Sequence, residues 1–399
     1  MVKKIAVLFL LILPTVFLGG CWDRKELNEV AVVLGTGIDW MADGRVRLAV
    51  QIARPTAFAG GGEAGGGGRD GTAASWVVSA EGKTVEDARV HLAAKIPREI
   101  YWGHGVILVL GEEMARKGTN MVTNFFLRDR QSRETMWVMV TKGEAKDFLE
   151  TFSAMAKTSA QAAGFLNVMK TGYSVRLSEF SEMMASKGVQ PVATWVGEVE
   201  AGVIPGLGQE MRPSAQRQVG LLGSAVFKDD RLVGWLDSYE TRGLLWLKGE
   251  AMRGVITVPS PGEPDKEVSI RIRRGRTRIV PEYDGEYLWF DVEVEMEGDV
   301  LEQQSSEDLA KPEKIEALEG EVAEAVKERA TAVLEKVRRE YQVDVFGFGN
   351  AFHRKYKKDW RELKDRWDEE FKRAEVNITV KSRIRDTGLL TKRASMPEE

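Results

Sequence analysis

The sequence is poor in the residue types that build metal sites and disulfides. Its 399 residues include one cysteine and three histidines. With a single cysteine, no disulfide can form within the chain. The histidines His91, His104 and His353 lie far apart and follow no spacing typical of metal ligands, which favours surface or packing roles. These scarcities argue against a metal centre and against a disulfide scaffold.

An excess of positive charge is also missing. The chain has 57 basic and 61 acidic side chains, a formal net charge of −4 at pH 7. Nucleic-acid binding usually requires a strongly basic face, so we expect no nucleic-acid partner.

Motifs for catalysis and phosphate binding are absent or incomplete. The glycine-rich stretch 59–71 lacks the Lys-Ser/Thr ending of a P-loop, so a flexible linker or strand connection is the better interpretation. The sequence shows no nucleophile elbow and no zinc-protease helix. Its adjacent acidic pairs are typical of solvated helices. We therefore expect no catalytic site and no cofactor.

Long apolar runs are limited to one, residues 5–18. Lys3 and Lys4 precede it, and two glycines lead from it to Cys21. A helix needs about 20 apolar residues to cross a bilayer, so this run is too short to span one. A positive start, a short apolar run and small residues at the end describe an export signal, predicted over 1–20. A short membrane anchor or a buried first helix is the alternative.

The ending of this run is more specific than its apolar core. Leu18-Gly19-Gly20-Cys21 resembles a bacterial lipobox, in which a diacylglyceryl group is attached to the cysteine and the signal is cut before it. Two acyl chains satisfy the requirement for stable membrane anchoring. The sequence therefore predicts Cys21 as the lipid attachment site and first mature residue.

Hydrophobic periodicity predicts a multidomain protein of mixed α/β (α+β) class. In the N-terminal region, 21–150, alternating strand patterns such as 46–52 are interspersed with amphipathic helices such as 84–96, which indicates an α/β domain. Residues 151–200 predict a small helical middle region. Residues 201–220 are rich in glycine and proline and predict a linker.

The C-terminal region, 221–390, predicts an antiparallel sheet covered by long helices, followed by a tail at 391–399. Apolar residues alternate along 288–296 and again along the final strand, and a long helical stripe begins near Pro312. A second helix, 352–371, mixes tryptophan with charged residues. It could lie on a membrane surface, but its many acidic residues favour packing against the sheet.

The segment 234–249 (GWLDSYETRGLLWLKG) combines aromatic residues with a compact charged group. An internal cap or ion pair within a buried helix is one interpretation. The other is a contact with another subunit, because charged groups beside tryptophans suit an interface hot spot. The candidate interface residues are Trp235, Glu240, Arg242 and Trp246.

Five stretches, in order along the chain, match one protein family. They are GCWDRKELNEVAVVLGTGID at 20–39, YWGHGVILVLGEEMARKG at 101–118, FFLRDRQSRETMWVMV at 125–140, AVFKDDRLVGWLDSYETRGLLWLKG at 225–249 and DVFGFGNAFHRKYKKDWRELKDRW at 344–367. Together they resemble the C-subunit lipoproteins of bacterial spore germination receptors, the Ger(x)C family. The glycine-rich stretch is not associated with this family.

The resemblance implies a non-enzymatic subunit of a nutrient germinant receptor, lipid-anchored on the outer face of the spore inner membrane. It implies two membrane partners, an A-type subunit and a transporter-like B-type subunit. The family fold of three α/β domains agrees with the periodicity. The family offers no catalytic residues to carry over, and only Cys21 maps onto a family position.

Two other protein classes would share an export signal. A substrate-capturing lipoprotein of a membrane transporter would need two similar lobes around a cleft, and no internal repeat is visible. A secreted hydrolase would need a nucleophile or a metal constellation, which the sequence does not show.

Overall fold

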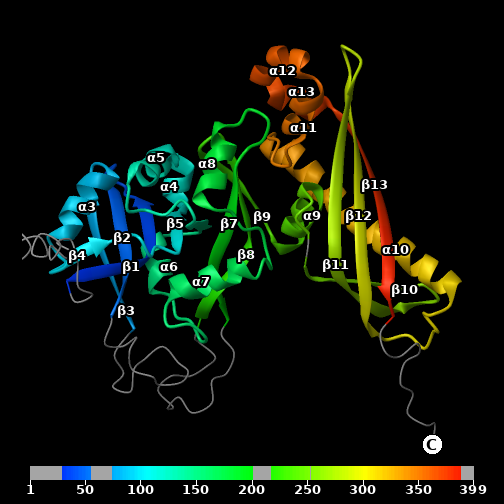
Figure 1. Ribbon diagram of the computed structural model, residues 1–399, viewed down its shortest axis with the longest axis horizontal. Coiled ribbons are helices and arrows are strands. Elements are labelled where there is room, and N and C mark those ends of the chain that lie inside the picture. The colour runs from blue at the N-terminus through cyan, green and yellow to red at the C-terminus, as the bar shows by residue number, and fades with distance from the viewer. Residues whose placement is uncertain (1–28, 55–73, 201–216, 252, 388–399) are drawn as a thin grey trace, which may run out of the picture.

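The computed structural model describes residues 29–54, 74–200, 217–251 and 253–387. Over these residues the chain forms two β-sheets that lie side by side along its long axis (Figure 1). The predicted signal, Cys21, the glycine-rich stretch and the tail lie outside the described residues, as does most of the predicted linker.

The first sheet has nine strands in the order β3-β2-β1-β5-β6-β7-β8-β9, with β4 beside β1. The strands are β1 (Val30–Trp40), β2 (Val46–Ala53), β3 (Ser75–Gly82), β4 (Glu99–Tyr101), β5 (Ile107–Gly111), β6 (Trp137–Thr141), β7 (Val192–Glu200), β8 (Arg217–Lys228) and β9 (Arg231–Leu236). The central strands β1, β5, β6 and β7 run parallel, and antiparallel hairpins extend the sheet on both sides. Both faces of the parallel core are apolar, as expected for a sheet covered on both sides.

Helices cover the two faces of this sheet unequally. They are α3 (Val85–Ala93), α4 (Glu112–Lys117), α5 (Asn120–Arg128), α6 (Ala145–Glu150), α7 (Ser159–Val168) and α8 (Leu177–Ala185). One apolar cluster contains buried residues of α3, α4, α5 and α8, and the opposite cluster contains those of α6 and α7. Thr84 caps the start of α3, since its hydroxyl accepts a hydrogen bond from the Asp87 amide at 3.1 Å.

The middle region predicted at 151–200 contains two helices, but these do not form a layer of their own. Helices α7 and α8 pack on the first sheet, and β7 is one of its strands. Strands β8 and β9 also pair into this sheet, so residues 217–236 belong structurally to the first unit. The remaining domain boundaries stay a prediction.

The second unit contains the four-stranded sheet β10-β11-β12-β13. Its elements are α9 (Ser238–Lys248), β10 (Val255–Ser260), β11 (Glu263–Tyr283), β12 (Leu288–Gln303), α10 (Pro312–Lys336), a π-helical turn (Val337–Tyr341), α11 (Phe348–Lys355), α12 (Lys357–Leu363), a 3₁₀ turn (Lys364–Arg366), α13 (Trp367–Arg373) and β13 (Glu375–Asp386). The mixed α/β, multidomain class is therefore confirmed. None of the described helices combines the length and apolar composition needed to cross a bilayer.

The direction of the last strand differs from the prediction. β13 pairs parallel to β12, with Phe290 opposite Val376 and Val294 opposite Val380, so the sheet is mixed and not antiparallel. Alternating burial reveals which face of a strand is covered, but it carries no information on strand direction. The long crossover through α10 to α13 returns the chain to the same end of the sheet, as a parallel pair requires.

The aromatic segment predicted as one helix over 352–371 is broken into three helices with buried rings. Phe352, Trp360, Trp367 and Phe371 are all buried. The interpretation of this segment as part of the core is confirmed.

Candidate functional site

The four candidate interface residues lie where the chain leaves the first sheet and enters the second unit. Trp235 is on β9, and Glu240, Arg242 and Trp246 are on α9. Asp237 starts that helix: its Oδ1 accepts a hydrogen bond from the Glu240 amide at 2.9 Å, and Glu240 Oε2 accepts one from the Asp237 amide at 2.9 Å. This capping box fixes the helix start directly after the strand.

Glu240 and Trp235 are also held by the end of α10. Lys336 Nζ lies 2.7 Å from Glu240 Oε1 and donates to the Trp235 carbonyl oxygen at 3.2 Å. The Tyr341 hydroxyl donates to the same carbonyl oxygen at 2.8 Å. The sequence allowed two interpretations of this segment, an internal cap or ion pair and a subunit interface. These contacts are the internal cap and the ion pair.

Trp246 and Arg242 also make contacts within the second unit. Trp246 is 1% exposed and belongs to the apolar core. Arg242 Nη2 donates to the Arg253 carbonyl oxygen at 2.7 Å. Burial and the nearby Arg329 lower the pKa of the Arg242 guanidinium from its usual value. Trp246 therefore cannot reach a partner without displacement of α9, whereas Trp235 is only half-buried.

A cluster that the sequence did not reveal surrounds Trp235. Its ring lies 4.9 Å from that of Trp195, and Lys142 Nζ lies 4.1 Å from the Trp195 ring centre and 5.3 Å from that of Trp235. A cation over an aromatic face is attracted by the ring quadrupole. We call Lys142, Trp195 and Trp235 the aromatic–lysine cluster. Its members come from three different parts of the chain, which is why no local pattern indicates it.

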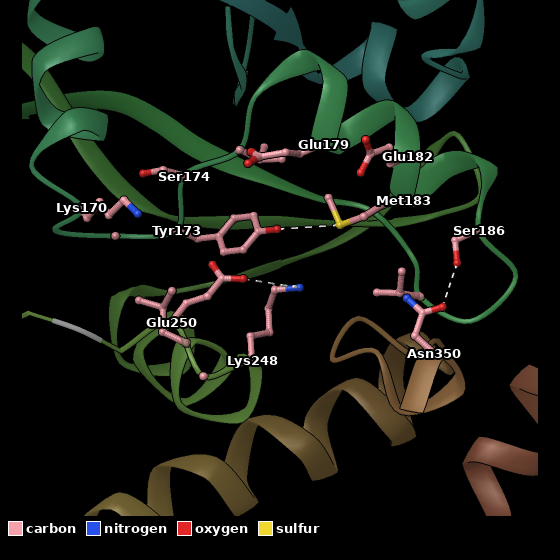
Figure 2. Close-up of a pocket in the computed structure, with 15 residues that line it drawn as sticks. Lys170, Tyr173, Ser174, Glu179, Glu182, Met183, Ser186, Lys248, Glu250 and Asn350 are labelled. Carbon is pink, nitrogen blue, oxygen red and sulfur yellow. Dashed lines mark hydrogen bonds and ion pairs between the residues drawn. The ribbon is translucent and has the colours of Figure 1, made fainter. Parts of the chain in front are cut away.

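A groove of about 430 Å³ lies between the two units (Figure 2). One wall is formed by the segment between α7 and α8 and by α8 itself, and the other by the end of α9 and by Asn350 of α11. Figure 2 shows Tyr173 lying above Lys248 and Glu250, with Glu179 and Glu182 on α8. The Tyr173 hydroxyl donates to Met183 Sδ at 3.8 Å.

The charges in this groove are balanced by one another. Lys248 Nζ lies 3.9 Å from Glu250 Oε1 and 5.6 Å from the centre of the Tyr173 ring. Desolvation by the groove walls raises the pKa of Glu250; Lys248 and Lys170 oppose this shift, while Glu179 reinforces it. Burial raises the pKa of Tyr173 well above its usual value, and the two nearby glutamates add to the shift. A groove of this size, lined by charged and polar side chains, can hold a small polar solute.

Below the groove, main-chain contacts join the two units. The Gln190 amide donates to the Asp344 carbonyl oxygen at 2.6 Å, and the Asn350 amide donates to the Gly188 carbonyl oxygen at 3.0 Å. Gly188 and Gly349 approach so closely that a Cβ on Gly349 would lie 2.6 Å from Gly188 Cα. Both glycines are therefore required by the close approach. We call these five residues the joint.

Metal and histidine chemistry finds no support in the described part of the chain. No three His, Cys, Asp or Glu side chains converge there in a way that could hold a metal ion. The histidines lie apart: His91 contacts the Glu81 carbonyl oxygen, His104 contacts the Tyr101 ring, and His353 stacks on Trp360.

Comparison with known proteins identifies the same family over both units. Residues 23–197 match the model of the spore germination protein N-terminal domain, and residues 222–388 match the spore germination B3/GerAC-like C-terminal model. Spore germination protein KC of Bacillus subtilis is 27% identical over 98% of this chain and 97% of its own length. Spore germination protein B3 of the same organism is 22% identical over 98% of this chain and 99% of its own length.

A solved structure shares the fold. The crystal structure of the GerBC protein superposes with a TM-score of 0.55 at 18% identity, covering 91% of this chain and 99% of that one. The two sheets, the order of the elements and the matched residues lead to one conclusion: this chain belongs to the Ger(x)C family, the C subunits of spore germination receptors.

Proposed function

We propose that this protein is the lipid-anchored C subunit of a nutrient germinant receptor, held on the outer face of the spore inner membrane. It acts there by binding an A-type and a B-type membrane subunit, without catalysis, and contributes to germinant sensing and the triggering of germination. The observation that carries the proposal is the match of the family models to residues 23–197 and 222–388, directly after a lipobox pattern that ends at Cys21.

The absence of a reactive constellation in the described residues supports a binding role. In the groove, Glu250 lies beside Lys248, and the deeply buried Asp344 accepts hydrogen bonds from main-chain and indole N–H donors. These charged groups are bound within the fold, so they stabilise it and are not poised for proton transfer.

The aromatic–lysine cluster is the best-supported part of the proposed subunit interface. It includes Trp235, one of the four candidates, and places two half-buried rings next to the exposed Lys142. Interface hot spots are enriched in tryptophan, and an accessible cation beside the rings gives orientation to a partner. Glu240 and Arg242 are also partly exposed, but Glu240 is paired with Lys336 inside the fold.

A substrate-capturing lipoprotein of a transporter is not favoured. Such a protein would be built from two similar lobes, whereas the two sheets here have nine and four strands in unrelated orders.

Replacement of Cys21 by alanine tests the anchoring. We expect an uncleaved precursor and weaker retention in the membrane fraction, because no acyl chains can then be attached. Mass spectrometry of the membrane-associated wild type should show a lipidated Cys21 as the first residue. An unmodified Cys21 with an intact signal in that fraction would sink the anchoring proposal. Co-purification with the membrane subunits tests partner binding separately, and a wild-type chain that brings down neither would contradict it.

A further inference from the structure

Helix α7 is unusual among the described helices of nine or more residues because it carries no charged side chain. Its inner side packs on the first sheet, where the Ala160 Cβ lies 2.9 Å from the position that a Cβ on Gly35 would occupy. Its outer side is apolar as well. Phe165 and Val168 are 63% and 62% exposed, and Met169, directly after the helix, is 60% exposed.

Phe165, Val168 and Met169 are spaced i, i+3 and i+4, so they share one face at the carboxyl end of α7. We call Phe165, Val168 and Met169 the α7 patch. Single exposed apolar side chains are normal on soluble proteins, but a group of large ones on a helix face without charge marks a contact surface. The exposed Lys170 follows the patch directly.

The amino-terminal end of the first sheet lies close to this patch. Gly164 contacts Val106, and the Val106 amide donates to the Leu34 carbonyl oxygen at 2.8 Å. The strand from Leu34 back to Val30 spans only roughly 13 Å. The stretch from Val30 back to Cys21 reaches at most roughly 30 Å when fully extended. A tether at Cys21 therefore holds this end of the sheet, and the patch with it, near the bilayer.

We propose that the α7 patch inserts its apolar side chains into the surface of the lipid bilayer, with Lys170 facing anionic headgroups. The inference rests on the proposed anchoring, which supplies the tether. The patch presents apolar side chains that can enter the interface, and the long side chain of Lys170 beside them can reach the headgroups. Its insertion would give the lipid-anchored subunit a fixed orientation, with α7 against the membrane.

A spin label at position 165 tests this insertion without dependence on natural lipidation. A chain that begins at Trp22 carries no cysteine, so Phe165→Cys introduces a single thiol for a nitroxide. An amino-terminal hexahistidine binds the chain to vesicles of phosphatidylglycerol, phosphatidylcholine and a nickel-chelating lipid. The matched control is Tyr287→Cys, in the turn after β11, where Tyr287 is 66% exposed.

On the vesicles we expect the label at 165 to become accessible to oxygen and protected from a water-soluble relaxation agent, while the label at 287 stays in water. We also expect Phe165→Glu with Met169→Glu to weaken binding of the untagged chain to the same vesicles by about tenfold, with Tyr287→Glu unchanged. A label at 165 that stays in water on bare vesicles overturns the inference. If that label is immobilised only after membrane subunits are added, the patch binds protein and not lipid, which also overturns it. A label already immobile in solution also overturns it, because the patch is then covered by the chain itself. Failure of the Cys21 test alone leaves this result intact, since the tag provides the tether.

Discussion

Replacement of Asp344 by alanine should lower the free energy of unfolding by about 3–5 kcal/mol, because this carboxylate organises the joint. Asp344 is 0% exposed. Its Oδ1 accepts hydrogen bonds from the Phe346 and Gly347 amides at 3.0 and 2.9 Å, and its Oδ2 accepts them from the Gly349 amide at 2.7 Å and from Trp367 Nε1 at 3.1 Å. Alanine leaves four buried donors without their acceptor.

Each buried donor left alone costs about 1–3 kcal/mol, and entry of water into the space left by the side chain keeps the total below the sum. Asp344→Asn keeps one acceptor oxygen but turns an NH₂ group toward N–H donors, so we expect an intermediate loss of about 2 kcal/mol. Urea unfolding of the mature chain, followed by tryptophan fluorescence and circular dichroism, measures both. Asp365→Ala, at an exposed aspartate nearby, is the control. A loss of less than about 1 kcal/mol for Asp344→Ala would refute the reasoning.

Three further predictions concern charge, interface and boundary. Burial raises the pKa of Asp39 from 3.8 to about 6, although two amides at the start of α6 donate to it. The stability that this group contributes is therefore fully present below pH 3.8 and lost as the pH rises through 6. Between pH 4 and 7.5 the unfolding free energy of Asp39→Asn should gain about 2.5 kcal/mol relative to wild type, and a pH-independent difference between the two proteins would contradict this. Arg242→Ala should impair receptor assembly, measured by co-purification, with little change in melting midpoint; a large loss of stability would assign Arg242 to the fold alone. A fragment 237–387 should unfold cooperatively in urea and gain no stability when extended to begin at residue 221, because strands β8 and β9 belong to the first sheet; a more stable longer fragment would restore the predicted boundary.

Sequence periodicity predicted where apolar faces lie but not how strands are oriented or grouped. The alternation along β12 and β13 correctly indicated one buried face for each. Their parallel pairing depends on the path of the chain through α10 to α13, which a local sequence pattern cannot predict. The glycine- and proline-rich stretch 201–220 looked like a linker between domains, yet the strands on either side of it are hydrogen-bonded neighbours in one sheet. A composition rich in glycine and proline indicates a connecting segment, but it does not reveal whether that segment joins two domains or two strands of one sheet.

In the candidate site, too, the sequence predicted local contacts but not contacts between distant residues. The Asp237-x-x-Glu240 spacing is a local capping signal that the sequence contains. The ion pair of Glu240 with Lys336 and the contact between the Trp235 and Trp195 rings join residues far apart in the chain, so they follow only from the fold. The groove has no signal of its own because its two walls come from different units.

The parallel pairing of β13 with β12 has a consequence for how the protein acquires its shape. The last strand of the second sheet, β13, follows the long crossover, so this sheet cannot be completed until Glu375–Asp386 has been synthesised. Closing a parallel pair across a long crossover is slow, since the entropy of a large loop is lost before the contacts form. The first sheet, by contrast, is complete at β9, well before that point. During synthesis the chain therefore passes through a stage in which its amino-terminal unit can fold while α10 and β12 still expose apolar surface. Truncation before Glu375 would make that aggregation-prone stage permanent.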